Sequence, residues 1–428
     1  MKIDILILYE HVQRELKNAC ILRVLLEREG YTVRINNVAW RKGLLNTIYK
    51  PKLIISPSCQ NDEGMFYILH NYIGAYNGGY KVLNLYSEQL ANSSAKDMLR
   101  VKDLALKIYH CAWGSFTYKR LLDTGIDKSQ IRITGSQRLD FTKPMFRNLL
   151  VDRKDLASKY GLDKDRKWIM MVGNFPAKDE QKLNYLSSVG YDNFQELKDL
   201  TKNTYYELIN WYETILNDNE LKDTIELIYR PHPNEIIDNK IVDLSKKYQH
   251  FHIIGDLTIS EWAINIDLAY IWSSTSSIEI STAGVPVVAL TPYKIKPYLE
   301  MELVKEIKKI DTVDECLIIT KDILAGKIKD INKDFKKEVE MYYQISDKSA
   351  SENIVDFVKD ILSSEDNIIM NEFNIFKGII KVFVYLYEYI LFKLNIKLNK
   401  YLEVRFRDYR TSNFIENYCK EIRDKISE

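Results

Sequence analysis

The sequence predicts an α/β protein with two domains, each built on a mostly parallel sheet that helices cover. Short apolar runs rich in β-branched residues alternate with segments of helical periodicity along most of the chain. The alternation comes in two series of similar size, separated by a polar stretch. The chain has 428 residues, which is too many for one ordinary core and enough for two α/β domains and an appendage.

The first series of strands starts at the beginning of the chain. Ile3–Leu8 is a continuous apolar run, which is typical of a strand buried on both faces. Leu16–Glu29 has helical periodicity and stops at Gly30, a residue that commonly ends helices. The other predicted strands are Thr32–Ile35, Leu53–Ser56, Lys81–Tyr86, Ile108–Trp113 and Ile131–Thr134. Residues 1–145 are therefore predicted to form the N-terminal domain.

The second series follows a polar stretch, residues 141–167, which contains Pro144 and is the predicted linker. Tyr205–Leu216 is a predicted helix with aromatic spacing. The predicted strands are Trp168–Val172, Ile225–Tyr229, Phe251–Ile254, Leu268–Trp272 and Val285–Leu290. Residues 166–345 are therefore predicted to form the second domain.

Composition narrows the function classes. Hydrophobic residues make up 46% and charged residues 28% of the chain, which is a globular composition. The formal net charge is +1, so no overall field attracts nucleic acid, and we expect no nucleic-acid partner.

The cysteines favour a reducing compartment. The five of them show no metal-ligand spacing, and an odd number does not suit a disulfide framework. The first residues enter a strand directly, so no signal peptide is predicted. No stretch reaches the roughly 18 uncharged apolar residues of a membrane span. We therefore expect a cytoplasmic protein.

Residues 346–428 are predicted to be a helical segment of different character. From 375 to 392 the chain is apolar and aromatic, and basic and aromatic residues then alternate up to residue 410. This composition favours peripheral attachment of residues 375–410 to the inner face of a membrane with anionic lipid. A pair of helices packed on the protein, or on a second subunit, fits equally well.

A rigid histidine motif follows one predicted strand of the second domain. Arg230-Pro231-His232-Pro233 comes directly after Ile225–Tyr229. Ligands of open α/β sheets bind beyond the carboxyl ends of the strands. The two prolines restrict the backbone around His232, and Arg230 offers a fork of donors suited to phosphate. The pattern indicates a phosphate-binding histidine rather than a structural one.

A cluster of hydroxyl residues follows another strand of this domain. Residues Ser273-Ser274-Thr275-Ser276-Ser277 come after Leu268–Trp272 and open a predicted helix that ends near Gly284. Hydroxyl groups and free N–H groups at a helix start can hold a phosphate. Glu279, one turn into the helix, is a candidate to bind a ribose diol. The alternative is a capping box of Ser276 and Glu279, which needs no ligand.

Taken together, these motifs resemble the bacterial surface-carbohydrate family of GT-B transferases, which includes capsule Kdo transferases and bacterial polysialyltransferases. The resemblance is collinear over roughly residues 1–345. The matching stretches are Arg230–Pro233, Ser274–Pro286, Trp113-Gly114, Thr134–Asp140 and Gly173–Phe175.

The resemblance implies two Rossmann-like domains that face each other across a cleft. Residues 1–145 would bind the acceptor and residues 166–345 the nucleotide-sugar donor. His232 would contact the donor phosphate together with the hydroxyl residues Ser274, Thr275, Ser276 and Ser277. Asn174, in the matching stretch after the first strand of the second domain, is a further candidate to bind the donor.

The resemblance also implies a carboxylate in the first domain that activates the acceptor hydroxyl. The family motif has two acids before a glycine, and the corresponding stretch here is Tyr86-Ser87-Glu88-Gln89. Glu88 is the one acid retained and is the candidate general base. Glu10 and His11 end the first strand and are candidates to line the same site. Asp62 and Glu63 are weaker rivals for the base.

The implied reaction is displacement at the anomeric carbon of a CMP-activated nonulosonic-type sugar (Kdo, sialic, legionaminic or pseudaminic acid). A cell-surface glycan or glycolipid would accept the sugar. Arg230, His232 and the hydroxyl cluster would stabilise the phosphate charge, so neither a metal nor a cofactor is expected. The Asp163-Lys164-Asp165 triplet is predicted to be a solvated turn.

Three other functions fit the same sequence. The first is a transferase that moves glycerol-phosphate or ribitol-phosphate from a CDP donor onto a teichoic-acid-like polymer. The second is a non-catalytic scaffold for capsule assembly, and the third is a nucleotide-sugar epimerase, which shares the two-domain shape.

Overall fold

A computed structural model shows how these segments fold. It describes residues 2–37, 50–61, 80–89, 100–175, 194–232, 235–301, 303–328, 330–365, 383, 386–387, 390–391, 393–394 and 410–427. The chain separates into two compact units. Unit 1 consists of Met1–Gln89, Arg100–Leu149 and Glu340–Glu428, and unit 2 of Leu90–Leu99 and Leu150–Val339.

Unit 1 is built on a six-stranded sheet in which every pairing is parallel. Its strand order is β2-β1-β3-β4-β5-β6. The strands are β1 (Lys2–Tyr9), β2 (Val33–Asn37), β3 (Lys50–Ser56), β4 (Lys81–Asn84), β5 (Tyr109–Ala112) and β6 (Ile131–Ile133). The order reverses direction between β1 and β3, which is where ligands bind in folds of this kind.

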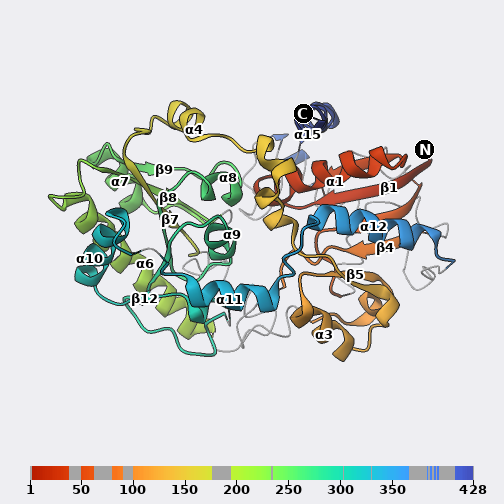
Figure 1. Ribbon diagram of the computed structural model, residues 1–428, viewed down its shortest axis with the longest axis horizontal. Helices are drawn as coiled ribbons and strands as arrows, with labels where there is room; N and C mark the ends of the chain where they lie inside the picture. The colour runs from red at the N-terminus through yellow and green to blue at the C-terminus, as the bar shows by residue number, and fades with distance from the viewer. Residues whose placement is uncertain are drawn as a thin grey trace. The chain divides into compact units, whose positions relative to one another are not determined.

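Alternate residues of β1 enter two different cores. Ile5 and Ile7 pack in a core with the helices α1 (Lys17–Arg28), α12 (Ala350–Ser363) and α15 (Ser412–Ser427). Leu6 and Leu8 pack on the opposite face, with Leu121 of α3 (Ser115–Asp123). Figure 1 shows α1 and α12 next to each other on this unit. The last part of the chain therefore completes the core that its first residues begin.

A buried lysine ties α12 to the sheet. The Lys81 ammonium, on β4, donates hydrogen bonds to the Ile361 carbonyl at 2.6 Å and to the Ser364 carbonyl and hydroxyl at 2.6 and 2.7 Å. These oxygens lie at the C-terminal end of α12, where the helix dipole favours a cation. Three acceptors satisfy the three ammonium protons, so the charge is tolerated in the interior.

Unit 2 is built on a second six-stranded sheet with parallel pairings. Its order is β12-β11-β10-β7-β8-β9, so the direction reverses between β7 and β10. The strands are β7 (Lys167–Val172), β8 (Ile225–Arg230), β9 (Phe251–Ile253), β10 (Leu268–Ile271), β11 (Val287–Leu290) and β12 (Lys309–Ile310). The sequence did not predict β12, which has two residues.

Helices cover both faces of this sheet. Ile169 and Met171 of β7 share a core with α6 (Phe194–Asn217), α7 (Asn239–Lys247) and α10 (Val313–Leu324). On the other face, Trp168 lies against Trp262 of α8 (Ile259–Ala263), with ring centroids 6.3 Å apart. Among its described residues the unit also contains the α-helices α4 (Arg153–Tyr160), α9 (Ser276–Thr282) and α11 (Lys333–Tyr342), and the last three residues of α11 belong to unit 1. Helix α4 forms within the stretch that the sequence predicts to be a linker.

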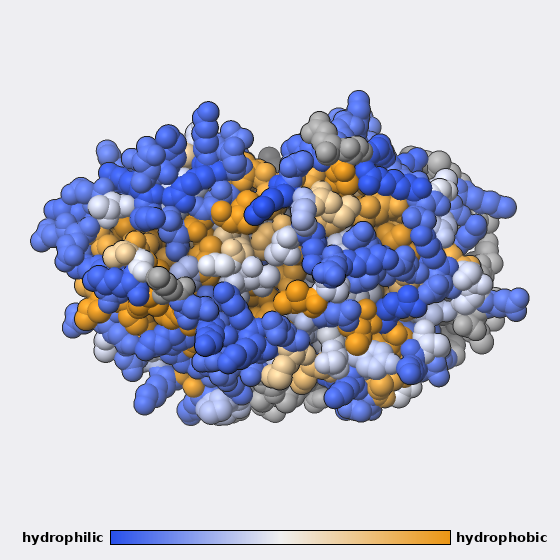
Figure 2. All heavy atoms as spheres, in the orientation of Figure 1, coloured by the Kyte–Doolittle hydropathy of each residue, from blue (hydrophilic) through white to orange (hydrophobic). Residues whose placement is uncertain are grey.

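One face of the molecule is mainly polar. Hydrophilic side chains cover most of the face drawn in Figure 2, and hydrophobic side chains appear in patches between them. None of the helices among the described residues combines the length and the apolar character that a membrane crossing requires. Most of residues 375–410 lie outside the described residues. In the part that is described, Phe383, Leu386, Tyr387, Ile390 and Leu394 are exposed.

Candidate functional site

The histidine motif lies at the carboxyl edge of the unit 2 sheet. Arg230 is the last residue of β8 and pairs with Val172 of β7, so His232 follows immediately beyond the edge. The turn that carries His232 is closed by a hydrogen bond from the Glu235 backbone N–H to the His232 carbonyl at 2.8 Å. The sequence prediction of a histidine at a strand end is confirmed in its position.

Arg230 is held by the loop after β9. Its guanidinium donates hydrogen bonds to the carbonyls of Asp256 and Leu257, both at 2.6 Å. Burial lowers the pKa of Arg230 to about 10, so the group stays charged near neutral pH. The two carbonyl bonds fix the direction of the fork, and three of its five N–H donors remain outside these two bonds. Phosphate binding by Arg230 stays a prediction.

Asn174 links the end of β7 to the hydroxyl cluster beyond β10. It follows β7, the strand that lies between β8 and β10, and its side-chain amide donates a hydrogen bond to the Ser273 carbonyl beyond β10. Next to it, Phe175 stacks on Trp272 with centroids 5.3 Å apart. His232 and the hydroxyl cluster therefore flank Asn174 at one edge, about two strand spacings, or roughly 10 Å, apart. This edge includes the point where the strand order reverses.

The hydroxyl cluster forms a turn and the first residues of α9. The Ser277 hydroxyl donates to the Ser274 carbonyl at 2.8 Å, and the Ser276 N–H donates to the Ser274 hydroxyl at 3.3 Å. The residue that caps α9 is Thr275, whose side chain makes no capping hydrogen bond. The predicted capping box of Ser276 and Glu279 is therefore absent. Ser277 and Glu279 are buried, whereas Thr275 and Ser276 are partly exposed.

Unit 1 has a cavity of about 40 Å³ at the carboxyl edge of its sheet. Residues from five strand ends line it: Leu8, Pro57, Leu85, Trp113 and Thr134. The cavity lies where the strand order reverses beside β1, and it has room for a few water-sized groups. Arg14, Glu15 and Arg138 bring charge to its walls.

Glu15 organises the loop after β1. Its carboxylate accepts from the backbone N–H of Glu10 at 2.6 Å and from that of His11 at 3.3 Å, and it pairs with Arg14 at 2.8 Å. Burial raises the pKa of Glu15, but Arg14, His11 and the Glu10 amide outweigh it and hold the pKa below its ordinary value. Glu15, which lines the cavity, thus holds the backbone of Glu10 and His11, and the role of these two residues in binding stays a prediction. The sequence did not single out Glu15, whose only signal is an acid six residues beyond the end of β1.

Glu88 lies at the same edge, beyond β4. Its Oε2 atom is 3.6 Å from the Arg138 guanidinium, which itself lies over the Trp113 ring at 5.5 Å. Its other carboxylate oxygen, Oε1, is buried and has no hydrogen-bond partner among the described residues. A carboxylate with one oxygen held near a cation and the other unbonded can accept a proton from a hydroxyl group. The structure brings Glu88 and the Glu10 loop to one edge of the sheet.

Asp140, the last residue of the Thr134–Asp140 stretch, is structural. It is 3% exposed, and its two oxygens accept from the N–H groups of Ala350 and Ser351, at 2.7 and 2.9 Å, at the start of α12. Burial raises the pKa of Asp140 to about 6, against the lowering effect of these hydrogen bonds. Of this stretch, Arg138 belongs to the cavity wall and Asp140 fastens α12.

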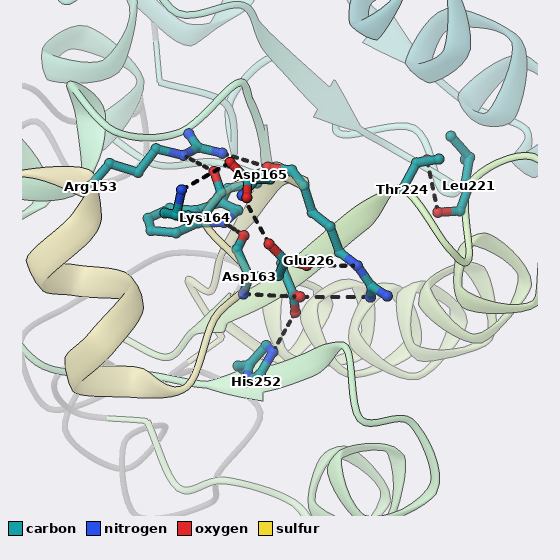
Figure 3. Close-up of polar contacts among 10 residues, drawn as sticks. Arg153, Asp163, Lys164, Asp165, Leu221, Thr224, Glu226 and His252 are labelled. Atoms are coloured by element: carbon teal, nitrogen blue, oxygen red, sulfur yellow. Dashed lines mark hydrogen bonds and ion pairs between the residues drawn. The ribbon is translucent and has the colours of Figure 1, made fainter.

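The acidic triplet predicted to be a turn lies at the opposite, amino edge of the unit 2 sheet (Figure 3). Asp163 accepts from the Asp165 N–H at 2.9 Å, and Asp165 pairs with Lys164 at 3.3 Å. Beside it, buried Glu226 contacts the His252 ring at 2.6 Å. Within the described ranges, no group of three or more acidic, histidine or cysteine residues could hold a metal ion. The weaker candidates Asp62 and Glu63 lie outside these ranges.

Comparison with known proteins identifies the fold. No family model and no curated protein matches the sequence. Among solved structures, the wall teichoic acid polymerase TagF soaked with CDPG has a TM-score of 0.55 at 10% identity, covering 84% of this chain and 89% of that chain. Another structure of TagF has a TM-score of 0.54 at 12% identity, covering 84% and 88%.

A UDP-N-acetylglucosamine 2-epimerase has a TM-score of 0.50 at 14% identity, covering 84% of this chain and 95% of that chain. Identities this low show the fold alone. Together with the two six-stranded parallel sheets, these likenesses confirm that the chain has the α/β fold of the GT-B proteins.

Proposed function

We propose that this chain is a glycosyltransferase that takes its sugar from a cytidine-activated donor, with a CMP-linked nonulosonic-type sugar as the substrate. One observation carries the proposal: Asn174 joins the strand end beside His232 to the strand end that carries the hydroxyl cluster. A cationic or protonated donor group and a set of hydroxyl groups on one sheet edge suit a phosphate leaving group.

The reaction transfers one sugar between two oxygens. The acceptor hydroxyl oxygen forms a bond to the anomeric carbon, and the bond from that carbon to the CMP oxygen breaks. Glu88 takes the hydroxyl proton through Oε1, and the bonding electron pair leaves with the phosphate. His232, Arg230 and the hydroxyl residues stabilise the charge that grows on the phosphate.

A CDP-polyol donor is the second candidate. It is favoured by the fold likeness to TagF, a polymerase whose structure was solved after soaking with CDPG. Both donors present cytidine and a phosphate, so the unit 2 edge suits either of them. They differ at the reacting atom, which is an anomeric carbon in one donor and a phosphorus atom in the other.

A donor panel separates these functions. Purified protein is incubated with CMP-Kdo, CMP-sialic acid, CDP-glycerol, CDP-ribitol and UDP-N-acetylglucosamine, each with an acidic oligosaccharide or a glycerol-phosphate oligomer as acceptor. We expect CMP release from a CMP-sugar, and we expect His232→Ala to lower its rate by about 100-fold or more at unchanged Tm.

The other results identify the rival functions. CMP release from a CDP-polyol alone would establish the polyol-phosphate transferase instead. Conversion of the UDP-sugar to its epimer would establish an epimerase. A protein that neither binds cytidine nucleotides nor turns over any donor would favour the non-catalytic scaffold.

Attachment to anionic membranes is a second, separable part of the proposal. Its support is the row of exposed apolar side chains at positions 383, 386, 387, 390 and 394, together with the basic residues that follow in the sequence. We expect the protein to sediment with vesicles that contain about 30% phosphatidylglycerol, because the basic residues are attracted to anionic lipid. It is not expected to sediment with vesicles of pure phosphatidylcholine. The double variant Leu386→Glu, Leu394→Glu is expected to lose this sedimentation. Ile318→Glu, at a residue of α10 that is 60% exposed, is the matched control.

A further inference from the structure

The carboxylate of Glu235 forms hydrogen bonds that fix the turn after β8. Glu235 Oε1 accepts a hydrogen bond from the Tyr229 hydroxyl at 2.5 Å, and Oε2 accepts one from the His232 backbone N–H at 3.2 Å. Tyr229 is buried at the end of β8, so its hydroxyl is a fixed point of the sheet. The same carboxylate thus binds the residue before Arg230 and the backbone of His232.

Gly173 makes room for this carboxylate. A Cβ atom at residue 173 would come 2.8 Å from Glu235 Oε2, and 3.0 Å from both the Arg230 carbonyl and the Tyr229 hydroxyl. The backbone N–H of Gly173 donates a hydrogen bond to the Arg230 carbonyl at 2.8 Å. This bond holds the backbone of residue 173 in place. The glycine directly after β7 therefore leaves room for the Glu235 carboxylate, the Tyr229 hydroxyl and the Arg230 carbonyl at one point.

We infer that Glu235 is a positioning residue, which fixes the turn so that the His232 imidazole faces the donor phosphate. The inference rests on the proposed function of His232. It goes beyond that function because it names the acid that orients the imidazole. Tyr229 binds this acid, and Gly173 leaves room for it.

A carboxylate suits this place better than an amide. Two of its partners, the Tyr229 hydroxyl and the His232 N–H, are donors. An ionised carboxylate accepts with both oxygens, whereas glutamine has one carbonyl oxygen and would direct its NH₂ group at a donor. Glu235→Gln keeps the size of the side chain and breaks one of the two contacts.

Histidine NMR tests the geometry without reference to activity. The chain has six histidines, and His232→Ala identifies the resonance of residue 232 in protein labelled with ¹³C-histidine. Glu235→Gln, Tyr229→Phe and Gly173→Ala are expected to shift or broaden that resonance. A His232 resonance at its wild-type position in all three variants overturns the inference.

Two control variants are matched to these changes. Asp238→Asn alters an acid three residues further on, which caps α7 through the Lys240 N–H at 2.9 Å and has no hydrogen bond to the described residues of the turn. Gly255→Ala adds a methyl group whose nearest neighbour, Pro231 Cγ, is at an ordinary 3.6 Å. Neither is expected to move the His232 resonance.

A double-mutant cycle tests the effect on transfer. Glu235→Gln is expected to lower kcat for CMP release by about 10- to 100-fold and to change the donor KM by less than about threefold. In the His232→Ala background the same change is expected to cost no further activity, because Glu235 acts through His232. Equal losses in both backgrounds would show a general structural role and overturn the inference. If no donor releases CMP, the proposed function fails, and the NMR result alone decides the role of Glu235.

Discussion

The side-chain amide of Asn174 donates a hydrogen bond to the main-chain carbonyl of Ser273, and this bond crosses from the end of β7 to the end of β10. Asn174→Ala removes it and leaves the carbonyl without that donor. We expect kcat/KM for the donor to fall about tenfold while the free energy of unfolding falls by only about 1 kcal/mol. Enzyme kinetics and chemical denaturation measure the two effects. Asn217→Ala, which removes bonds to the Glu213 carbonyl at 2.9 Å and the Tyr248 hydroxyl at 2.7 Å at the end of α6, is expected to change stability alone.

Glu88 and Glu10 are rival acids at one sheet edge. We expect Glu88→Gln to lower kcat by about 100- to 10,000-fold, because the amide cannot take a proton from the acceptor. Glu10→Gln is expected to keep activity within about threefold, since the loop is organised by the Glu10 backbone N–H and Glu15. Transfer rates at saturating donor and acceptor distinguish the two. The reverse order of effects would assign the base to Glu10.

Lys81 is predicted to matter for stability rather than for transfer. Lys81→Met keeps the length of the side chain but leaves the Ile361 and Ser364 carbonyls of α12 without their donor. We expect a loss of about 2–4 kcal/mol in the free energy of unfolding, measured by denaturant titration. Lys359 lies on the same helix, α12, and forms an exposed ion pair with Glu29 at the end of α1. Lys359→Met removes this pair and is expected to have no measurable effect on stability. Equal stability of the two variants would contradict this account of the buried ammonium.

Asp140 and His110 give unit 1 two opposing pH dependences. Burial raises the pKa of Asp140 from 3.8 to about 6, so the folded state binds its proton more tightly and this group lowers stability as pH rises from about 4 to 6. Burial lowers the pKa of His110 from 6.5 to about 4, so this group lowers stability as pH falls from 6.5 to 4. The two contributions therefore act in opposite directions over this pH range.

Asp140→Asn removes one side of this balance. The free energy of unfolding of the variant is expected to fall more steeply than that of the wild type as pH is lowered from 6.5 to 4, because the opposing contribution of Asp140 is removed. Urea titrations at half-unit pH steps give the two curves. Parallel curves for the two proteins would show that Asp140 does not titrate in this range.

The strands were the most predictable part of the fold. Every run rich in β-branched residues that the sequence indicated, from Ile3–Leu8 to Val285–Leu290, coincides with a strand, because a parallel strand buried on both faces needs continuous apolar residues. The two residues of β12, Lys309 and Ile310, are too few to make such a pattern. Helix α4 was not predicted because its residues are mostly polar and it lies on the surface of unit 2.

The site residues that follow strands were predictable, and the acids that hold their loops were not. His232, Asn174 and the hydroxyl cluster follow strands directly, so the rule for parallel sheets finds them. Glu15 and Glu235 act on backbone N–H groups that only the folded loops bring to them. Likewise, the apolar faces of α12 and α15 indicate that they pack on something, but their partner, α1, is more than 300 residues away in the sequence.

The chain leaves unit 1 after Leu149 and returns to it at Glu340, and its last helix, α15, contributes Ile415, Cys419 and Ile422 to the core around α1. A ribosome therefore releases residues 150–339, which make up most of unit 2, as a continuous stretch while the part of unit 1 within the first 149 residues still lacks part of its interior. During translation the early strands must wait, with apolar surface uncovered, until the final helix emerges. We expect their folding in the cell to depend on chaperones far more than that of unit 2.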